Sequence, residues 1–304
     1  MKYNKVILAG GSGYLGMILA EHFSKQAHEV VIFSRNPKTA AKNIKMIYWD
    51  GHTIGDWATH LNNSDVLINL TGKSVNCRYN ERNKAEIFAS RLNATRVLGK
   101  ALKQTNNPPK VWINAASATI YRHAEDRPQD EYTGELGTGF SVDVCKQWEQ
   151  AFAEQHVPGI RKLALRISVV LGSNGGVANY YLNLARFGLG GIQGSGKQYF
   201  SWVHEDDITG SIDFLLDNPT LEGAFNIASP YPIQNNKLMA TIRKAVGVPF
   251  GLPATKWMLE IGTLLLRTET ELILKSRWVL PTRLTEAGYI FKVPDIKQAI
   301  EKSI

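Results

Sequence analysis

Cysteine is scarce in this chain of 304 residues, which contains only Cys77 and Cys145. Two cysteines so far apart make neither a disulfide framework nor a metal-ligand spacing. No cluster of His, Cys and Asp supplies the ligands of a metal site either. We therefore expect no bound metal, and a reducing compartment, which we take to be the cytoplasm.

Long uninterrupted hydrophobic runs are also missing. The apolar stretch near the N-terminus is too short for a signal peptide, and it is already explained as a strand. The Leu- and Ile-rich segment from Trp257 to Leu274 is interrupted by charged residues such as Glu260 and Arg267. This segment predicts amphipathic core helices and not a membrane span.

No block of consecutive Lys or Arg occurs, although the formal net charge is +8. The positive residues are dispersed, and the densest early group is Lys38, Lys42 and Lys45. A dispersed excess favours small anionic ligands and indicates a solvated surface, not a stripe that binds nucleic acid. We expect a small-molecule partner, with neither nucleic acid nor membrane, and the sequence leaves the oligomeric state open.

The first half of the chain alternates apolar strand patterns with amphipathic helix patterns. The expected strands are Val6–Ala9, Val30–Ser34, Met46–Trp49, Val66–Leu70, Val111–Ala115 and Leu163–Ile167. The expected helices are Leu15–Lys25, Asn80–Lys103 and Val142–Glu154. Near-continuously apolar strands that alternate with helices indicate a parallel sheet covered on both faces. With right-handed crossovers, the fold class is α/β with a doubly wound, Rossmann-like sheet.

A glycine-rich turn joins the first expected strand to the first expected helix. The run Gly10-Gly11-Ser12-Gly13-Tyr14-Leu15-Gly16 has the spacing G-x-G-x-x-G from Gly11 and G-x-x-G-x-x-G from Gly10. Glycines allow a tight turn close to a pyrophosphate, and the helix N-terminus offers free N–H groups and a positive dipole end. Because the strand-turn-helix context is present, we predict that these seven residues bind a dinucleotide cofactor.

The end of the second expected strand indicates which dinucleotide is bound. An NAD site usually has Asp or Glu here for the ribose 2′-hydroxyl, whereas an NADP site uses Arg for the 2′-phosphate. This chain has Ser34-Arg35, with Lys38 close behind and no acid. A guanidinium matches a phosphate in a bidentate way, so Arg35 predicts NADP(H).

The amino-acid composition changes after Val170, where glycine becomes frequent. We expect a loop-rich segment over the ligand edge of the sheet, with one helix near Ala178–Arg186. A helix near Asp206–Asp217 and a strand near Ala224–Ala228 follow, and the chain from about Pro230 is mostly helical. The expected domains are a Rossmann domain, 1–172 and 206–229, and a smaller, mostly helical C-terminal cap domain, 173–205 and 230–304.

Several runs resemble the extended short-chain dehydrogenase/reductase superfamily. They are Gly10–Gly16, Asn69-Leu70-Thr71-Gly72 and Ala116-Ser117-Ala118-Thr119-Ile120-Tyr121. Other runs resemble the bacterial and mitochondrial "epimerase family" proteins, described as nucleoside-diphosphate-sugar epimerases and sometimes as cell-division inhibitors. These runs are 186–191, 194–198, 201–204 and Asp206-Asp207, together with 281–284 and 288–289 for that family's small C-terminal domain. The resemblance covers nearly the whole chain.

The resemblance implies roles for individual residues. Leu70, Thr71 and Gly72 would line the path of the adenosine and ribose, and Ala116 would be a further cofactor contact. Asp50 would reach the adenine, or it belongs to a turn. Ser117 has the position of the hydroxyl that polarises a substrate carbonyl; the alternative is a buried strand-end serine bonded to backbone.

The catalytic pair of the superfamily is where this sequence departs from the resemblance. Superfamily enzymes carry Tyr-x-x-x-Lys on the helix after Ser117, and the Tyr acts as general acid and base. Counting back from Trp148-Glu149, the two positions are occupied by Ser141 and Cys145. Lys146 is one residue away and would face about 100° from the required direction. Ordinary keto–hydroxyl redox chemistry is therefore in doubt.

Other side chains could serve in place of the missing pair. Tyr121 lies four residues after Ser117, and we name these two as the candidate catalytic residues. His204 and Gln198 are candidate substrate contacts, although His204 is as well explained as a cap of the following helix. Three more alternatives remain open: Arg91 and Arg166 bind a substrate anion or pair with acids, and Cys145 is a reactive thiol or a small buried hydrophobe.

Two functions follow from these residues. The first is an NADP(H)-binding oxidoreductase or epimerase-like protein that acts on an unidentified small or sugar-nucleotide-like substrate. The second is a non-catalytic NADP(H)-binding sensor or interaction protein. The missing Tyr–Lys pair favours the second, and the glycine-rich, aromatic segment over the site favours the first.

Overall fold

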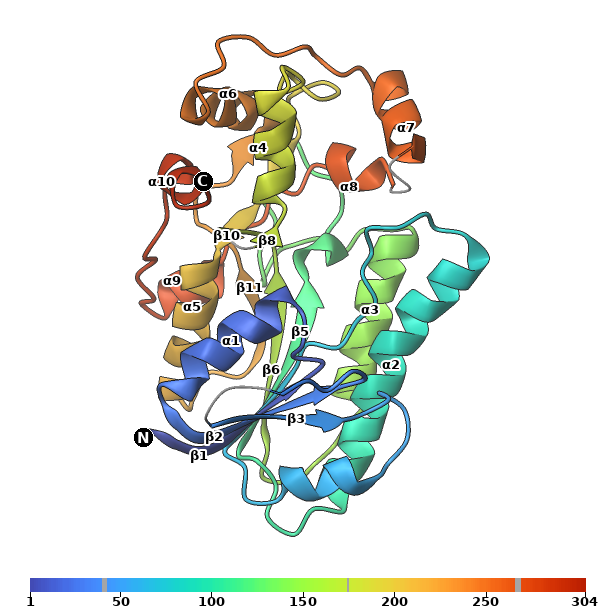
Figure 1. Ribbon diagram of the computed structural model, residues 1–304, viewed down its shortest axis with the longest axis vertical. Helices are drawn as coiled ribbons and strands as arrows, with labels where there is room; N and C mark the ends of the chain where they lie inside the picture. Colours follow the sequence, from blue (N-terminus) through green and yellow to red (C-terminus); the bar gives the residue numbers. More distant parts are fainter. Residues whose placement is uncertain (40–42, 174, 266–268) are drawn as a thin grey trace.

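The computed structural model describes residues 1–39, 43–173, 175–265 and 269–304. Its centre is a seven-stranded sheet in the order β11-β6-β5-β4-β1-β2-β3, and neighbouring strands pair in parallel. This arrangement confirms the predicted doubly wound α/β fold (Figure 1). The strands are β1 (Tyr3–Ala9), β2 (Ala27–Ser34), β3 (Ile44–Tyr48), β4 (Val66–Asn69), β5 (Val111–Ser117), β6 (Arg161–Ile167) and β11 (Gly223–Ile227).

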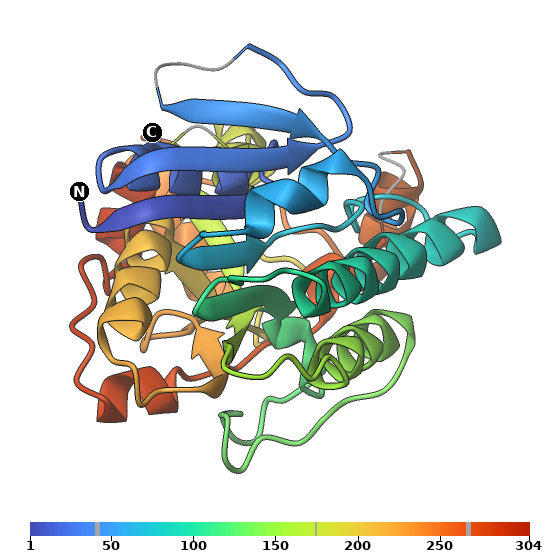
Figure 2. The same ribbon diagram turned by 90° about the horizontal axis from the view of Figure 1, so that it is seen from below.

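Helices cover both faces of this sheet, which is why its strands are apolar throughout. Helices α1 (Tyr14–Ser24) and α5 (Glu205–Asp217) lie on one face, and α2 (Glu81–Lys103) and α3 (Phe140–Ala153) lie on the other (Figures 1 and 2). Successive side chains of a strand point to opposite faces. Two separate cores result, one containing Val6, Leu8, Leu19 and Phe23 and the other Ile7, Val31, Leu98 and Trp112.

A second, smaller region is formed by segments before and after β11 and is mostly helical, as predicted. Its helices α4 (Ala178–Arg186), α6 (Asn235–Ala245) and α10 (Ile296–Glu301) enclose a third core that includes Leu182, Trp202, Met239 and Ile300. Short strands in two small sheets complete it: β7 (Val169–Gly172), β8 (Gly175–Gly176) and β10 (Trp202–His204) in one, and β9 (Tyr199–Phe200) and β12 (Ile233–Gln234) in the other. Three other short helices lie elsewhere in the chain: η1 (Asp56–Leu61), η2 (Ala118–Ile120) and α9 (Thr282–Glu286).

The prediction of core helices between Trp257 and Leu274 needs a correction. The segment forms α7 (Lys256–Leu265) and α8 (Glu271–Leu274), but Trp257 is 62% exposed and Ile261 is 52% exposed. The reason is that α7 lies at the periphery of the molecule, where no described element covers that apolar face (Figure 1). Arg267 lies outside the described residues. No helix in the described part of the chain is long and apolar enough to cross a membrane.

Candidate functional site

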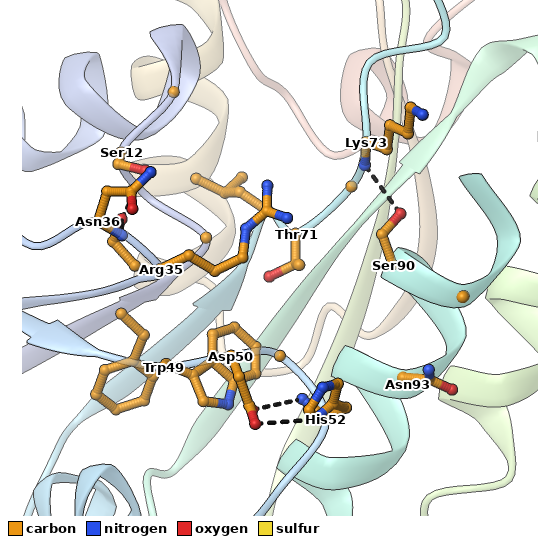
Figure 3. Close-up of a pocket in the computed structure, with 18 of the residues that line it drawn as sticks. Ser12, Arg35, Asn36, Trp49, Asp50, His52, Thr71, Lys73, Ser90 and Asn93 are labelled. Carbon is orange, nitrogen blue, oxygen red and sulfur yellow. Dashed lines mark hydrogen bonds and ion pairs between the residues drawn. The ribbon is translucent and has the colours of Figure 1, made fainter. Parts of the chain in front are cut away.

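A cavity of about 630 Å³ opens at the carboxyl ends of β1, β2, β3 and β4. We call it the glycine-turn cavity (Figure 3). Its walls come from the turn after β1, the segments after β2, β3 and β4, and one side of α2. The lining includes Gly10, Ser12, Gly13, Ser34, Arg35, Trp49, Asp50, Leu70, Thr71, Gly72, Lys73 and Ser90. This edge is where open parallel sheets bind their ligands.

The glycines of the turn have two different functions in the structure. Gly10 has φ +71°, and a β-carbon there would lie 2.6 Å from Thr71 Oγ1. A β-carbon on Gly11 would lie 2.7 Å from Leu8 Cβ, and one on Gly16 would overlap the Gly11 backbone. At Gly13, by contrast, a β-carbon meets nothing within 4 Å. Three glycines therefore allow the chain to close on itself, and Gly13 faces open space in the cavity.

Polar groups around this cavity are left without partners in the described part of the chain. Thr71 Oγ1 and Trp49 Nε1 are buried and make no hydrogen bond. Helix α1 begins after Gly13, and no side chain caps its N-terminus. Buried polar groups are normally hydrogen-bonded, so these groups fit a ligand with phosphate and hydroxyl oxygens.

Arg35 lies at the rim of the cavity, directly after β2, and is exposed. Figure 3 shows its side chain extended across the cavity between the glycine turn and Thr71. No carboxylate among the described residues pairs with it. Ser34, which occupies the end of β2, donates a hydrogen bond to Ser12 Oγ at 3.0 Å and so ties this strand end to the turn.

Asp50 lines the same cavity after β3 and also forms a turn. Its carboxylate accepts hydrogen bonds from the backbone N–H groups of His52 and Thr53, both at 2.9 Å, and pairs with His52 Nδ1 at 2.8 Å. Burial opposes ionisation, but these hydrogen bonds outweigh it and lower the pKa of Asp50. Asp50 therefore belongs to a turn that borders the cavity, and its contact with the adenine stays a prediction.

A second, smaller cavity of about 100 Å³ lies at the end of β5, and we call it the Ser117 cavity. Ser117, Thr119, Arg91, Ser141 and Cys145 line it, together with Tyr79, Trp148 and Leu272. Arg91 also borders Gly72 of the first cavity, since a β-carbon on Gly72 would lie 2.9 Å from the Arg91 guanidinium carbon. The two cavities thus lie on either side of Arg91.

The two positions of the missing catalytic pair face the Ser117 cavity. Ser141 Oγ donates to Glu271 Oε2 at 3.1 Å and lies 3.4 Å from the Tyr79 hydroxyl. The Cys145 thiol is buried, and burial raises its pKa to about 11, against the opposing charge of Arg91. A serine hydroxyl and a protonated thiol do not reproduce a Tyr–Lys proton relay at neutral pH.

The two predicted catalytic residues lie in different surroundings. Ser117 lines the Ser117 cavity and accepts a hydrogen bond from the Thr119 N–H at 3.2 Å, so it also begins η2. Tyr121 is only 2% exposed; its hydroxyl donates to Asn226 Oδ1 at 3.1 Å and accepts from Arg166 at 2.8 Å. Tyr121 lines neither cavity, so its catalytic role stays a prediction that its burial does not support.

The structure distinguishes the two arginines that the sequence left open. Arg166 forms a bidentate pair with Glu149, with N–O distances of 2.8 and 2.7 Å, and so pairs with an acid. Arg91 has no carboxylate partner among the described residues. Its guanidinium donates to the carbonyl oxygens of Lys73 and Ile87 and lies 5.0 Å from the Trp148 ring centroid.

The two predicted substrate contacts are both engaged within the second region. His204 is 3% exposed, and its Nδ1 accepts from the Asp206 N–H at 3.2 Å, which caps α5. Gln198 is 4% exposed and donates to the Gln193 carbonyl at 2.8 Å. Neither residue lines the two cavities described above, and their substrate-binding role stays a prediction.

Four predicted cofactor contacts remain to be placed. The Tyr14 ring packs against Gly175 and its hydroxyl donates to Glu205, so this residue joins the turn to the second region. Leu15 and Leu70 pack against the first core, and Leu70 also lines the glycine-turn cavity. Ala116 is buried near the end of β5, one residue before Ser117. No group of three or more His, Cys, Asp and Glu able to hold a metal occurs among the described residues.

Sequence reasoning missed the residues that the C-terminal segment brings to the Ser117 cavity. Lys275 Nζ donates to the Thr119 carbonyl at 2.9 Å, and Arg277 Nε donates to Thr119 Oγ1 at 3.3 Å. Glu271 accepts from Ser141 in the same place. No local pattern marks these three residues, because their partners lie more than a hundred positions earlier in the chain.

A larger cleft of about 760 Å³ lies on the other side of α8, and we call it the α8 cleft. Lys275 and Glu271 line it, as do Arg122, His123, Leu136, Thr138, Lys256, Glu260 and Leu274. Leu272 of the same helix faces the Ser117 cavity. Helix α8 and Lys275 therefore form the wall between the cleft and the Ser117 cavity.

Relatives of known structure share this arrangement over almost the whole chain. The crystal structure of human epimerase family protein SDR39U1 with NADPH covers 98% of this chain and 98% of its own, with 28% identity and a TM-score of 0.87. A UDP-N-acetylglucosamine 4-epimerase from Bacillus cereus, at 17% identity, 98% and 94% coverage and a TM-score of 0.76, shares the fold.

Sequence comparison agrees with the structural one. Epimerase family protein YfhF of Bacillus subtilis is 30% identical over 304 residues, covering 98% of this chain and 97% of that protein. Residues 254–303 match a domain of unknown function, DUF1731, and residues 6–228 match the NAD dependent epimerase/dehydratase family. The chain with this sheet, this glycine turn and this C-terminal segment belongs to the NAD dependent epimerase/dehydratase family.

Proposed function

We propose that this protein binds NADP(H) and is an oxidoreductase or epimerase that acts on a small-molecule carbonyl or hydroxyl substrate. One observation carries the cofactor choice: Arg35 lies at the rim of the glycine-turn cavity, where an NAD site has an acid, and it pairs with no carboxylate of the described residues. The NADPH in the similar human structure supports the proposal. A sugar nucleotide is a candidate substrate, because similar folds include UDP-sugar enzymes.

The residues present fit this cofactor. Gly13 and the uncapped start of α1 would hold the pyrophosphate, Arg35 the 2′-phosphate, and Thr71 Oγ1 a hydroxyl or phosphate oxygen. When bound, the nicotinamide supplies or accepts hydride. Arg91 would lie near the bound cofactor, because it contacts Gly72 of the glycine-turn cavity and lines the Ser117 cavity.

Ser117 is the group that we propose to polarise the substrate. Its hydroxyl can turn from the neighbouring Cys145 thiol to donate to a carbonyl oxygen in the Ser117 cavity, while it accepts from Thr119 N–H. Fixed donors of this kind act mainly on the charge that develops on oxygen in the transition state. The missing Tyr–Lys pair leaves the proton to another group, and Tyr121 remains the candidate from sequence.

A specific observation favours the second function, a non-catalytic NADP(H)-binding protein. Ser141 is tied to Glu271, and Cys145 keeps its proton at neutral pH. Neither can carry a proton between substrate and solvent. In this alternative the protein binds NADP(H) through the same residues, but it converts no substrate in the Ser117 cavity.

Cofactor titration with Arg35→Ala tests the proposal. A guanidinium–phosphate contact contributes on the order of 1.5–3 kcal/mol. We expect the variant to bind NADPH roughly ten- to hundred-fold more weakly and NADH unchanged, as measured by calorimetry. Lys38→Ala, a nearby positive residue that does not line the cavity, is the matched control. Equal affinity of the unmodified protein for NADH and NADPH would show that Arg35 does not select the cofactor.

We also propose that the chain divides as its sequence suggests, into 1–172 with 206–229 and 173–205 with 230–304. The separate third core supports this division. Leu284 and Tyr289, which belong to the second unit, nevertheless pack into the first core. The two units are therefore expected to act as one rigid support for the cavities.

A further inference from the structure

Three cations meet around the wall between the Ser117 cavity and the α8 cleft. Lys275 and Arg277 both bond to Thr119, and Arg91 lines the Ser117 cavity beside Cys145. Arg91 and Lys275 both act on the same Cys145 thiol, lowering its pKa against the larger effect of burial. The three positive groups thus surround one small volume.

The opposite charge in this volume is too small to balance the cations. None of the three forms an ion pair with a carboxylate among the described residues. Glu271 is the acid that favours the charged forms of Lys275 and Arg277, and its Oε2 already accepts from Ser141. Buried charges are normally paired, so this arrangement is complete only with an added anion.

Lys275 is the cation with access to a ligand. Its Nζ holds the Thr119 carbonyl at 2.9 Å while its side chain lines the α8 cleft. The cleft, at about 760 Å³, has the size of a small-molecule site. Burial, followed by the neighbouring charge of Arg277, lowers the pKa of Lys275 to about 8.

Lys275 and Ser117 bond to opposite ends of the Thr119 residue. The Thr119 N–H donates to Ser117 Oγ, and the Thr119 carbonyl accepts from Lys275 Nζ. Lys275 lines the α8 cleft and Ser117 lines the Ser117 cavity, so an anion beside the Lys275 ammonium lies on the cleft side of the wall. The ammonium charge, together with the lack of a carboxylate partner among the described residues, sets the chemical class of the ligand.

We propose that the α8 cleft binds a small molecule that carries a carboxylate or phosphate group, and that Lys275 pairs with this anionic group. This pairing does not rest on the proposed function. Lys275 discriminates between charged and neutral forms of the same ligand. Arg91 and Arg277 add to the positive potential without direct contact.

Paired ligands test the proposal by calorimetry on the full chain, with and without NADPH. One pair is acetoacetate and its neutral methyl ester, and the other is dihydroxyacetone phosphate and dihydroxyacetone. We expect at least one anion to bind roughly tenfold or more tightly than its neutral partner, and the stronger pair identifies carboxylate or phosphate. Equal affinity within both pairs would overturn the proposal.

Three variants assign the effect to Lys275. Lys275→Met should lose the preference for the anion, whereas Lys275→Arg should keep it, which also controls for folding. Lys256→Met removes a positive charge from the exposed side of the same cleft and should keep the preference. A loss in Lys256→Met as large as that in Lys275→Met would show a general charge effect and contradict the pairing.

Proton uptake gives an independent measurement. At about pH 8 a bound anion should raise the pKa of Lys275, so that binding takes up a proton and the heat differs between Tris and HEPES buffers. The other titratable groups facing Lys275 are Arg277, Glu271 and Cys145, with Arg122, His123, Lys256 and Glu260 in the cleft. Lys275→Arg should bind the anion without this uptake, since Arg stays protonated.

The results of these experiments distinguish failure of the proposed function from failure of the anion site at Lys275. Anion preference without any NADPH binding would reject the proposed function and keep the anion site. NADPH binding without anion preference would reject the anion site alone. Uptake that persists in Lys275→Arg would assign the proton to another group and contradict the role of Lys275.

Discussion

At the scale of the residue, the turn contains two kinds of glycine, which differ in what an added β-carbon would meet. Gly16 lies against the backbone of Gly11, and Gly13 lies open to the glycine-turn cavity. The same substitution should therefore disturb folding at one position and ligand binding at the other.

We expect Gly13→Val to abolish NADPH binding and leave the fold intact, because its side chain fills only the space left for the pyrophosphate. Gly16→Val should instead lower the free energy of unfolding by about 2 kcal/mol or more, since its β-carbon overlaps backbone. Calorimetric titration and urea unfolding of both variants give the comparison. Normal NADPH affinity in a folded Gly13→Val protein would contradict the dinucleotide site.

Ser117 and Tyr121 also differ in their surroundings, so their substitution should affect different properties of the protein. Ser117→Ala removes a donor in the Ser117 cavity, and we expect about 10²–10³-fold slower turnover on any substrate found. Tyr121→Phe removes a buried hydroxyl between Asn226 and Arg166, and should lower the free energy of unfolding by about 1–2 kcal/mol. Turnover per folded molecule and urea unfolding separate the effects. A large loss of turnover in Tyr121→Phe would restore its catalytic role.

At the scale of the element, helix α5 begins with a cap that depends on pH. His204 Nδ1 accepts from Asp206 N–H, its Nε2 is buried without a partner in the described structure, and burial lowers its pKa despite the nearby Asp206. The folded state therefore binds a proton at His204 less readily than the unfolded state.

Because of this cap, we expect the free energy of unfolding to fall as the pH is lowered. The stabilisation is present above the pKa of His204 in the unfolded chain, about 6.5. It is lost as the pH falls through the lower pKa that His204 has in the folded protein. His204→Asn keeps a capping oxygen and removes the titration, whereas His204→Ala loses the cap, about 1 kcal/mol, at neutral pH. We expect urea unfolding of His204→Asn to change less between about pH 7.5 and 5.5 than that of the unmodified protein. Identical pH profiles for the two proteins would exclude His204 as the titrating group.

At the scale of the whole molecule, the C-terminal segment is fastened to the Rossmann sheet by a buried carboxylate. Asp207 of α5 is 1% exposed; its carboxylate accepts from the N–H groups of Lys292 and Val293, at 2.7 and 2.9 Å, and from the Tyr289 hydroxyl. Since Tyr289 also packs into the first core, the two regions should unfold together.

Asp207→Asn replaces one acceptor oxygen by an N–H₂ group among donors. We expect the free energy of unfolding to fall by about 2–4 kcal/mol, with faster hydrogen exchange over residues 289–304. Asp206→Asn is the matched control, because its pair with Lys302 is half-exposed and should contribute less than about 1 kcal/mol. Two separate unfolding transitions in the unmodified protein would contradict the coupling.

The sequence by itself determined the sheet, its covering helices, and the glycine turn that opens the first cavity. Each rests on neighbours in the chain: apolar periodicity, a cap such as Asn80 before α2, and glycine spacing between Gly10 and Gly16. Short strands such as β9 and β12 escaped prediction because two residues carry no periodicity.

Only the tertiary structure decided which side chains meet at the Ser117 cavity. Arg166 pairs with Glu149, and Tyr121 is buried with its hydroxyl bonded to Arg166 and Asn226, although sequence spacing alone allowed both to face a ligand. Lys275 reaches Thr119 from the far end of the chain. Local patterns fix which face of a helix or strand is apolar. The burial of a side chain, its partners and its pKa depend instead on which distant elements pack against it. Residue spacing within one segment carries no information about those distant partners.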